Sequence, residues 1–143
     1  MASKFNLKVV TPTRTPYDGE VETVILPGTQ GELAILSDHM PLVVALSGGI
    51  TTIRNEGEDR VAMVFGGIAQ VLENQLTLIV PYFEWSDEID QHRAQAAIED
   101  AERRMSETES AEGRRRVELA IRRNNVRLEV SSYSVIKGRV GGS

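Results

Sequence analysis

Five arginines lie within ten residues near the end of the chain, as Arg114-Arg115-Arg116 and Arg122-Arg123. A guanidinium group binds an oxyanion through two parallel hydrogen bonds, so clustered arginines suit a phosphate or an acidic protein surface. The alternative is a solvated helix face without a partner. The net charge of −5 argues against nucleic acid as the partner. The cluster therefore predicts a site for a phosphate group or for an acidic protein.

Catalytic chemistry has little support among the titratable residues. The two histidines are His39 and His92. Asp38 and His39 are adjacent in a predicted loop, and adjacent side chains rarely point to one place, so an active site built on them is the least favoured interpretation. There is no cysteine, and the histidines lack the spacing of a metal-ligand set. We expect a non-catalytic binding subunit with no metal and no required cofactor.

The first part of the chain, up to about residue 82, has the pattern of an all-β domain. Short apolar runs rich in Val, Ile, Leu and Thr alternate with turn residues such as Asp18-Gly19, Asn55-Glu56-Gly57 and Gly66-Gly67. This spacing predicts a sandwich or a flattened barrel. The predicted strands cover residues 5–10, 21–26, 32–36, 42–46, 50–55, 60–65, 68–72 and 75–80.

After Trp85 the apolar period changes to that of a helix. Ser86 is the expected N-cap of a helix that runs to about Met105, and a second helix follows a polar connector with Ser110 and Gly113. Two apolar seams at helical spacing predict an antiparallel hairpin, in which an acidic and a basic helix partly neutralise each other and dock weakly. The seams are Ala94, Ala97, Ile98, Ala101 and Met105, and Val117, Ala120, Ile121, Asn124 and Leu128.

We divide the chain into a head, residues 1–84, a hairpin, residues 85–130, and a tail, residues 131–143, to which no structure is assigned. The first ten residues alternate polar and apolar side chains and do not have the pattern of a signal peptide. No window approaches the roughly 20 apolar residues that a membrane-spanning helix needs. Any membrane contact is therefore expected to be indirect.

Three stretches carry a resemblance to a known family. Gly31-Glu32-Leu33-Ala34-Ile35-Leu36-Ser37-Asp38-His39-Met40-Pro41-Leu42 is similar to the pattern G-x-L-(G/A)-I-x-x-x-H-x-P-L, and Gly49-Ile50 and Gly66-Gly67-Ile68-Ala69-Gln70-Val71 follow it. Ile89-Asp90-Gln91-His92-Arg93-Ala94 matches (I/L)-D-x-x-R-A, and Ala101-Glu102-Arg103-Arg104 continues in the same way. Over about residues 4–129 the chain resembles the epsilon subunit of bacterial F-type ATP synthases, called delta in mitochondria.

The resemblance implies an α+β fold, with a sandwich of about ten strands followed by a two-helix hairpin. It implies a central-stalk subunit that turns with the rotor and couples proton or sodium flow to ATP synthesis. The head would bind the gamma subunit and the ring of c subunits, with Glu32 and His39 in the facing loops. The hairpin would inhibit ATP hydrolysis when extended along gamma. Its contacts with the beta subunits would come from Arg114, Arg115, Arg116, Arg122 and Arg123.

Some bacterial members of the family bind ATP on the folded hairpin, which favours the compact form. By position, the resemblance places Glu84, Ile89, Asp90, Arg93, Ala94, Arg123 and Arg127 at such a site. Arg93, Arg123 and Arg127 would converge on the triphosphate from two helices. Asp100, however, stands where nucleotide-binding members can carry arginine, and Arg93 paired with nearby acids is the alternative. ATP as a regulatory ligand and a site without ATP both stay open at this point.

The resemblance also implies a location at the cytoplasmic face of the bacterial inner membrane, or at the equivalent side of an energy-transducing organelle membrane. Contact with the membrane would be made only through the complex. The competing interpretation is a generic non-catalytic adaptor whose arginine-rich hairpin grips an acidic partner.

Overall fold

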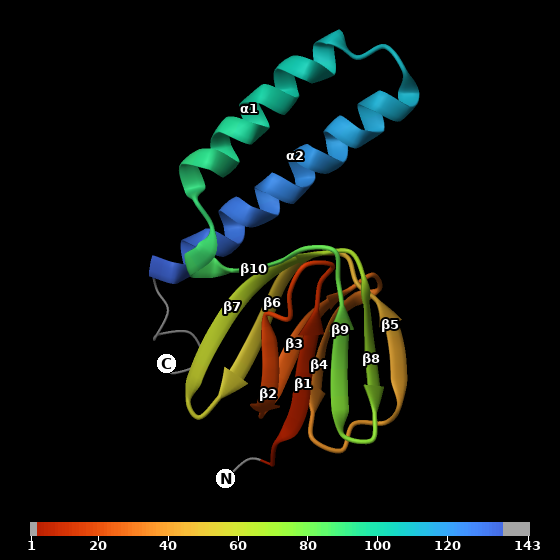
Figure 1. The fold of residues 1–143 in the computed structure, drawn as a ribbon, viewed down its shortest axis with the longest axis vertical. Helices are drawn as coiled ribbons and strands as arrows, with labels where there is room; N and C mark the ends of the chain where they lie inside the picture. The colour runs from red at the N-terminus through yellow and green to blue at the C-terminus, as the bar shows by residue number, and fades with distance from the viewer. Residues whose placement is uncertain (1–2, 136–143) are drawn as a thin grey trace.

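The computed structural model describes residues 3–135. A β-rich head carries a helical hairpin that projects from one of its ends (Figure 1). The predicted α+β fold, a ten-stranded sandwich followed by a two-helix hairpin, is confirmed. Most of the predicted tail, residues 136–143, lies outside the described residues.

Ten strands form two sheets of five strands each. The first sheet has the order β2-β1-β9-β8-β5, and the second has the order β10-β7-β6-β3-β4. Strand β1 pairs in parallel with β9, while the other pairs are antiparallel. The strands are β1 (Phe5–Val10), β2 (Tyr17–Val21), β3 (Thr23–Gly28), β4 (Gly31–Leu36), β5 (Leu42–Ala45), β6 (Gly48–Asn55), β7 (Glu58–Phe65), β8 (Ile68–Leu72), β9 (Gln75–Ile79) and β10 (Phe83–Trp85).

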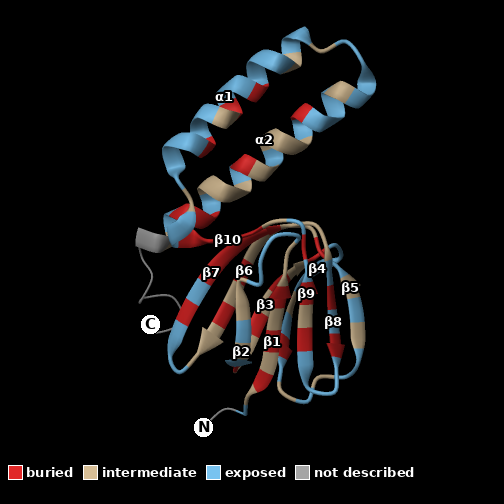
Figure 2. Ribbon diagram, viewed as in Figure 1, coloured by how far each residue is buried: buried red, intermediate tan, exposed pale blue. Residues whose placement is uncertain are grey.

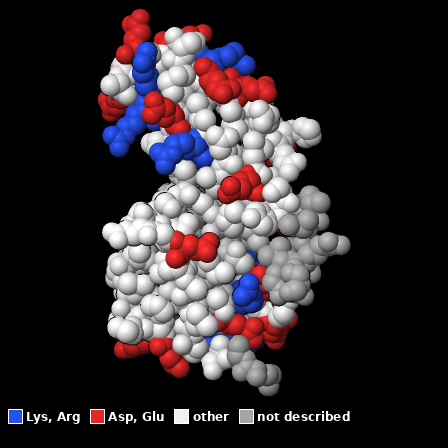
Figure 3. Space-filling model, turned by 180° about the vertical axis from the view of Figure 1, so that it is seen from behind, with Lys and Arg blue, Asp and Glu red and all other residues white. Residues whose placement is uncertain are grey.

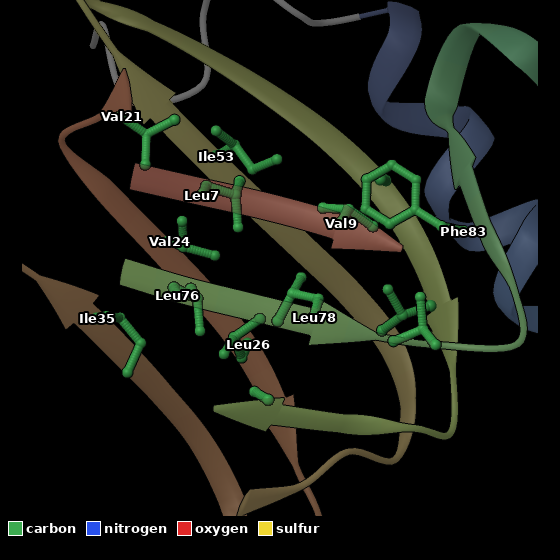
Figure 4. Packing of buried hydrophobic residues seen from close by; sticks show 14 of the residues in the cluster. Leu7, Val9, Val21, Val24, Leu26, Ile35, Ile53, Leu76, Leu78 and Phe83 are labelled. Carbon is green, nitrogen blue, oxygen red and sulfur yellow. The ribbon is translucent and has the colours of Figure 1, made fainter. Parts of the chain in front are cut away.

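The core of the head lies between the two sheets. Each strand directs alternate side chains inward, as with Phe5, Leu7 and Val9 of β1, which are buried while their neighbours are partly exposed. Figure 4 shows side chains of both sheets meeting in this layer, and Figure 2 shows the buried positions along the strands. The core cluster contains no residue after Trp85, so the head has a hydrophobic core of its own.

Two strands, β2 and β10, do not appear among the eight predicted ones. The sequence predicts a turn at Asp18-Gly19, but both residues lie in β2, which pairs antiparallel with β1. An edge strand tolerates glycine and aspartate better than a central one, because it is paired on only one side. Strand β10 extends to Trp85, one residue beyond the predicted limit of the head.

The hairpin consists of α1 (Gln91–Glu107) and α2 (Ala111–Ser131). The predicted N-cap, Ser86, is wrong, because Ser86 begins a short 3-10 helix, η1 (Ser86–Glu88), and Asp90 caps α1 by accepting from the N–H of Arg93 at 3.1 Å. Ser110 caps α2 by accepting from the N–H of Gly113 at 3.0 Å. A connection of three residues therefore joins the helices.

The predicted seam between the helices is present. Its buried residues are Ala94, Ile98 and Ala101 on α1 and Val117 and Asn124 on α2. The predicted neutralisation of one helix by the other is not observed, because among residues 3–135 no ion pair joins α1 to α2. Asp100 pairs with Arg103 and Arg104 within α1, and Glu112 pairs with Arg116 within α2. The helices are therefore held together mainly by packing of the seam residues and not by ion pairs.

The hairpin meets the head mainly through the C-terminal part of α2. Val130 packs on Val61 and Met63, which point outward from β7, and these three residues form a small cluster separate from the core of the head. Tyr133, in the 3-10 helix η2 (Ser132–Val135), packs against the same cluster. Helix α1 packs chiefly on α2, so the hairpin is attached to the head at one end.

Candidate functional site

A cleft of about 340 Å³ lies at the root of the hairpin, where β10, η1, the first turns of α1 and the last part of α2 come together. Its volume falls within the range of small-molecule sites, about 300–1,000 Å³. Of the seven residues that the resemblance places at an ATP site, six line it. The lining residues are Glu84, Glu88, Ile89, Asp90, Arg93, Ala94, Ala97, Asn124 and Arg127.

One wall of the cleft is a three-residue network between β10 and α2. The Nε and Nη2 atoms of Arg127 donate to the two carboxylate oxygens of Glu84 at 2.9 and 2.8 Å. Its Nη1 donates to Oδ1 of Asn124 at 2.9 Å, and Asn124 donates through Nδ2 to the carbonyl of Ala120 at 2.9 Å. Every nitrogen of the Arg127 guanidinium therefore has a partner inside the protein.

A second carboxylate, Glu88, lies at the rim. It accepts from the N–H of Trp85 at 2.9 Å and from both terminal nitrogens of Arg14 at 3.1 Å. The hydrogen bond from Arg14 lowers the pKa of Glu88 below its ordinary value, although partial burial acts in the opposite direction. The pair keeps Glu88 ionised at neutral pH and raises the pKa of Arg14.

Arg93 differs from the other arginine of the cleft. Its side chain is exposed, and within residues 3–135 no carboxylate pairs with it. The alternative in which Arg93 pairs with nearby acids is therefore not what the structure shows. Asp90, one turn earlier, uses its carboxylate to cap α1. Arg93 is thus a cation at the cleft that is available to an anionic ligand.

Arg123, the seventh predicted residue, does not line the cleft. Its guanidinium lies over the ring of Tyr82, 4.6 Å from the ring centroid. Asp100 is also absent from the lining, and its carboxylate pairs with Arg103 at 3.3 Å and Arg104 at 3.1 Å. The expected repulsion of phosphate by Asp100 is therefore weakened by distance and by pairing.

The cleft combines an apolar surface with polar ends. Ile89, Ala94 and Ala97 supply the apolar part, and Arg93 supplies a free positive charge. Such a lining suits a ligand that has a flat apolar portion and an anionic portion. Asn124 entered the sequence analysis only as a seam residue, although its i, i+3 spacing to Arg127 places both on one helix face. Nothing in the sequence pointed to the pair of Arg14 and Glu88.

The two predicted head residues lie toward opposite ends of β4. Glu32 is near the start of β4 and pairs with Pro27 of β3, whereas His39 follows the other end of β4. His39 Nδ1 lies 2.8 Å from the carbonyl oxygen of Met40. Asp38 has a φ of 63° and donates through its N–H to Oδ1 of Asn74 at 2.8 Å. His39 thus makes the local contact expected of a loop histidine, and the structure shows no hydrogen bond between it and Asp38.

The predicted basic patch is only partly accessible. Arg114, Arg115, Arg116 and Arg122 are exposed on α2, while Arg123 is half-buried over Tyr82. Charged side chains of both signs crowd the hairpin in Figure 3, whereas the head presents few of them on that face. The accessible patch therefore consists of four arginines.

The first sheet exposes an apolar surface that the sequence analysis did not single out. Large apolar side chains of β5, β8 and β9 are exposed there, and Met40, which precedes β5, is 77% exposed. These are Val43, Ile68, Leu72 and Ile79. Ile68 pairs directly with Ile79, so their side chains are neighbours on the outer face of the sheet. The sequence feature that could have indicated this surface is the presence of apolar residues at both alternating positions of β8 and β9.

Two kinds of site are not found in the part of the chain that the structure describes. Residues 3–135 contain no group of three or more His, Cys, Asp or Glu side chains that could hold a metal ion. None of the described helices has both the length and the apolar character to cross a membrane.

A β-sandwich with an exposed apolar face, joined to a hairpin with a polar cleft at its root, defines a two-part binding protein. Comparison with known families shows to which family of proteins this two-part fold belongs. Residues 4–86 match the family described as ATP synthase, Delta/Epsilon chain, beta-sandwich domain, and residues 87–132 match its long alpha-helix domain. The chain therefore belongs to the ATP synthase delta/epsilon family, as the sequence resemblance indicated.

Individual relatives agree with this assignment. The ATP synthase epsilon chain of Caldanaerobacter subterraneus subsp. tengcongensis is 36% identical over 133 residues, which cover 92% of this chain and 96% of the relative. The epsilon chain of Alkaliphilus oremlandii is 44% identical over 106 residues, covering 74% and 79%. A chain of the Euglena gracilis mitochondrial ATP synthase structure shares the fold, with a TM-score of 0.75, 19% identity and coverage of 95% and 83%.

Proposed function

We propose that this chain is a rotor subunit that couples proton or sodium flow to ATP synthesis, and that its hairpin acts as a brake on ATP hydrolysis. The observation that carries the proposal is the attachment of the hairpin at one end. Its contact with the head is a small cluster around Val61, Met63 and Val130, apart from the head's own core. The hairpin can therefore detach as a unit while the head stays folded.

The head would bind the gamma subunit through its exposed apolar face. Large apolar patches on a monomer usually mark interaction sites, and His39 adjoins this one through Met40. The c ring would then contact the opposite end of β4, where Glu32 lies beside the β3–β4 turn. The separation of Glu32 and His39 supports two distinct partners for the head.

The extended hairpin would contact the beta subunits through Arg114, Arg115, Arg116 and Arg122. All four are exposed, and the described structure offers only weak surface pairs for them, such as Arg116 with Glu112 at 3.6 Å. Arg123 would join them only after leaving the ring of Tyr82. Release of the hairpin would therefore both extend the patch and expose its last member.

The brake is tested by locking the hairpin in place. Because the chain has no cysteine, one cysteine in β6 and one in the last turns of α2, with Cα atoms within about 7 Å, would form a single defined disulfide. Oxidised protein added to the purified alpha, beta and gamma subunits should bind without inhibiting ATP hydrolysis. Dithiothreitol should restore the inhibition, and each single-cysteine variant should inhibit with or without it.

Other outcomes would change the proposal. Binding without inhibition in the reduced state would remove the brake and leave the coupling role. Absence of binding in either state would favour the generic adaptor with an acidic partner elsewhere.

We further propose ATP as a regulatory ligand of the cleft, one that stabilises the docked hairpin. Ile89, Ala94 and Ala97 would face the adenosine part, and Arg93 would contact a phosphate. Arg127 is held by Glu84 and Asn124, so it reaches a phosphate only if Glu84 shares or releases it. The free guanidinium of Arg93 is the main support for an anionic ligand here.

Isothermal titration of the full chain with ATP tests this site. Wild-type protein should release heat with ATP at up to millimolar concentration, and Arg93→Ala should bind at least about tenfold more weakly, as expected for the loss of a charged hydrogen bond. Arg103→Ala is the matched control, since Arg103 is an exposed α1 residue outside the cleft. A wild-type chain that shows no heat would refute ATP as a ligand.

We place the chain at the cytoplasmic face of a bacterial inner membrane, or at the equivalent side of an organelle membrane, bound through its complex. The name of one relative, the chloroplastic epsilon chain of Calycanthus floridus, 38% identical over 127 residues, supports an energy-transducing membrane system. Fractionation supports this if the chain leaves washed membranes together with the catalytic subunits.

A further inference from the structure

An arginine of the head, Arg14, pairs with Glu88, which lines the cleft. Arg14 lies in the loop between β1 and β2, and its side chain extends to β10 and to η1. Its Nη1 and Nη2 each donate to a carboxylate oxygen of Glu88 at 3.1 Å, and Nη2 also donates to the carbonyl of Phe83 at 2.9 Å. One guanidinium therefore contacts both β10 and η1.

The loop orders the backbone of Arg14. The N–H and the hydroxyl of Thr11 donate to the carbonyl oxygen of Arg14 at 2.9 and 3.0 Å. The N–H of Arg14 donates back to Thr11 Oγ1 at 3.1 Å. Because these bonds already restrict the loop, less conformational entropy is lost when the side chain pairs with Glu88.

Glu88 depends on the head for its positive partners. Three carboxylates line the cleft, namely Glu84, Glu88 and Asp90. Glu84 pairs with Arg127 of α2, and Asp90 caps α1, where the positive end of the helix dipole compensates its charge. Within residues 3–135 the cations that act on Glu88 are Arg14 and, more weakly, Arg60, and both belong to the head.

We infer that Arg14 is a positioning residue for the nucleotide cleft, where it neutralises the carboxylate of Glu88. The inference rests on the proposed ATP site. Without Arg14, an uncompensated carboxylate at the rim would repel a triphosphate. A loop of the head therefore sets part of the affinity of a site that is otherwise built from β10 and the hairpin.

Titration of the full chain with ATP distinguishes neutralisation of the Glu88 charge from a purely structural role in which Arg14 only holds η1 to the head. Arg14→Gln should weaken binding about three- to fivefold, a moderate effect because the two side chains are 43% and 40% exposed. Glu88→Gln should bind as tightly as wild type or more tightly. The double variant should recover most of the loss, because no carboxylate is left to neutralise. Arg103→Gln, which removes one exposed charge far from the rim, should match wild type.

If Arg14 acted only by holding η1 to the head, the opposite result is expected for the double variant. It would bind ATP at least as weakly as Arg14→Gln, because both variants lack the ion pair between Arg14 and Glu88. Raising the NaCl concentration should also reduce the difference in ATP affinity between wild type and Arg14→Gln, because salt screens partly exposed charges. If the wild type binds ATP and Arg14→Gln binds it with the same affinity, the inference is overturned but the ATP proposal stands. The same holds if the double variant does not regain the affinity that Arg14→Gln loses. A wild-type chain that does not bind ATP overturns the ATP proposal and this inference together.

Discussion

At the scale of single residues, the root of the hairpin is organised by polar groups that satisfy one another. Arg127 uses all of its nitrogens on Glu84 and Asn124, and Glu88 uses both carboxylate oxygens on Arg14. Arg93 remains available because no acid lies in a position to pair with it among the described residues. The ability of the cleft to bind an anion therefore depends on the charge of Arg93, which the fold leaves unpaired.

Thr51 shows what happens when a buried polar atom has no such partner. It is fully buried in β6, opposite Ala62 of the core, and its hydroxyl makes no hydrogen bond. Thr51→Val keeps the shape and removes the unsatisfied group, so the free energy of unfolding should rise by about 1 kcal/mol. Urea denaturation measures this. Thr52→Val, on the opposite face, should stay within about 0.5 kcal/mol of wild type, and a Thr51→Val chain less stable than wild type would contradict the explanation.

At the scale of elements, α2 has two separate packing surfaces. Its middle part faces α1 through Val117 and Asn124, and its last turns face the head through Val126 and Val130. The alanines of α1 permit close approach of the helices, so the hairpin can keep its own structure when it leaves the head. The weak joint is therefore between α2 and β7, not between the helices.

Val130→Ala should open this joint selectively. Val130 is fully buried in the small cluster with Met63, and removing its methyl groups should weaken docking by about 1–3 kcal/mol. Hydrogen exchange should then become faster in the last turns of α2 and unchanged in β1 and β9. Leu78→Ala, in the core of the head, should instead accelerate exchange throughout the sandwich. Faster exchange in the strands of Val130→Ala would show that head and hairpin unfold together.

At the scale of the whole molecule, the core of the head is separate from the small cluster through which α2 packs on β7. The disulfide-locking test belongs to this scale, because it restricts the position of the hairpin and leaves its exposed arginines unchanged. The proposed ligand acts at the same joint, since the cleft is lined from both β10 and α2. A ligand that contacts both parts would favour the docked state by its differential affinity.

The two-part fold could be predicted from the amino-acid sequence, because burial periods of two and of about 3.6 residues are local properties of strands and helices. It missed β2 and β10, whose turn-like or very short segments are stabilised by neighbours and not by their own pattern. Six cleft residues were found through the family motif and its neighbourhood, but their pairing was not. Glu84 and Arg127 are 43 residues apart, and Arg14 and Glu88 are 74 apart. Which arginine is paired and which is free could not be predicted in this way, because it depends on how α2 and the β1–β2 loop pack around β10 in the folded chain.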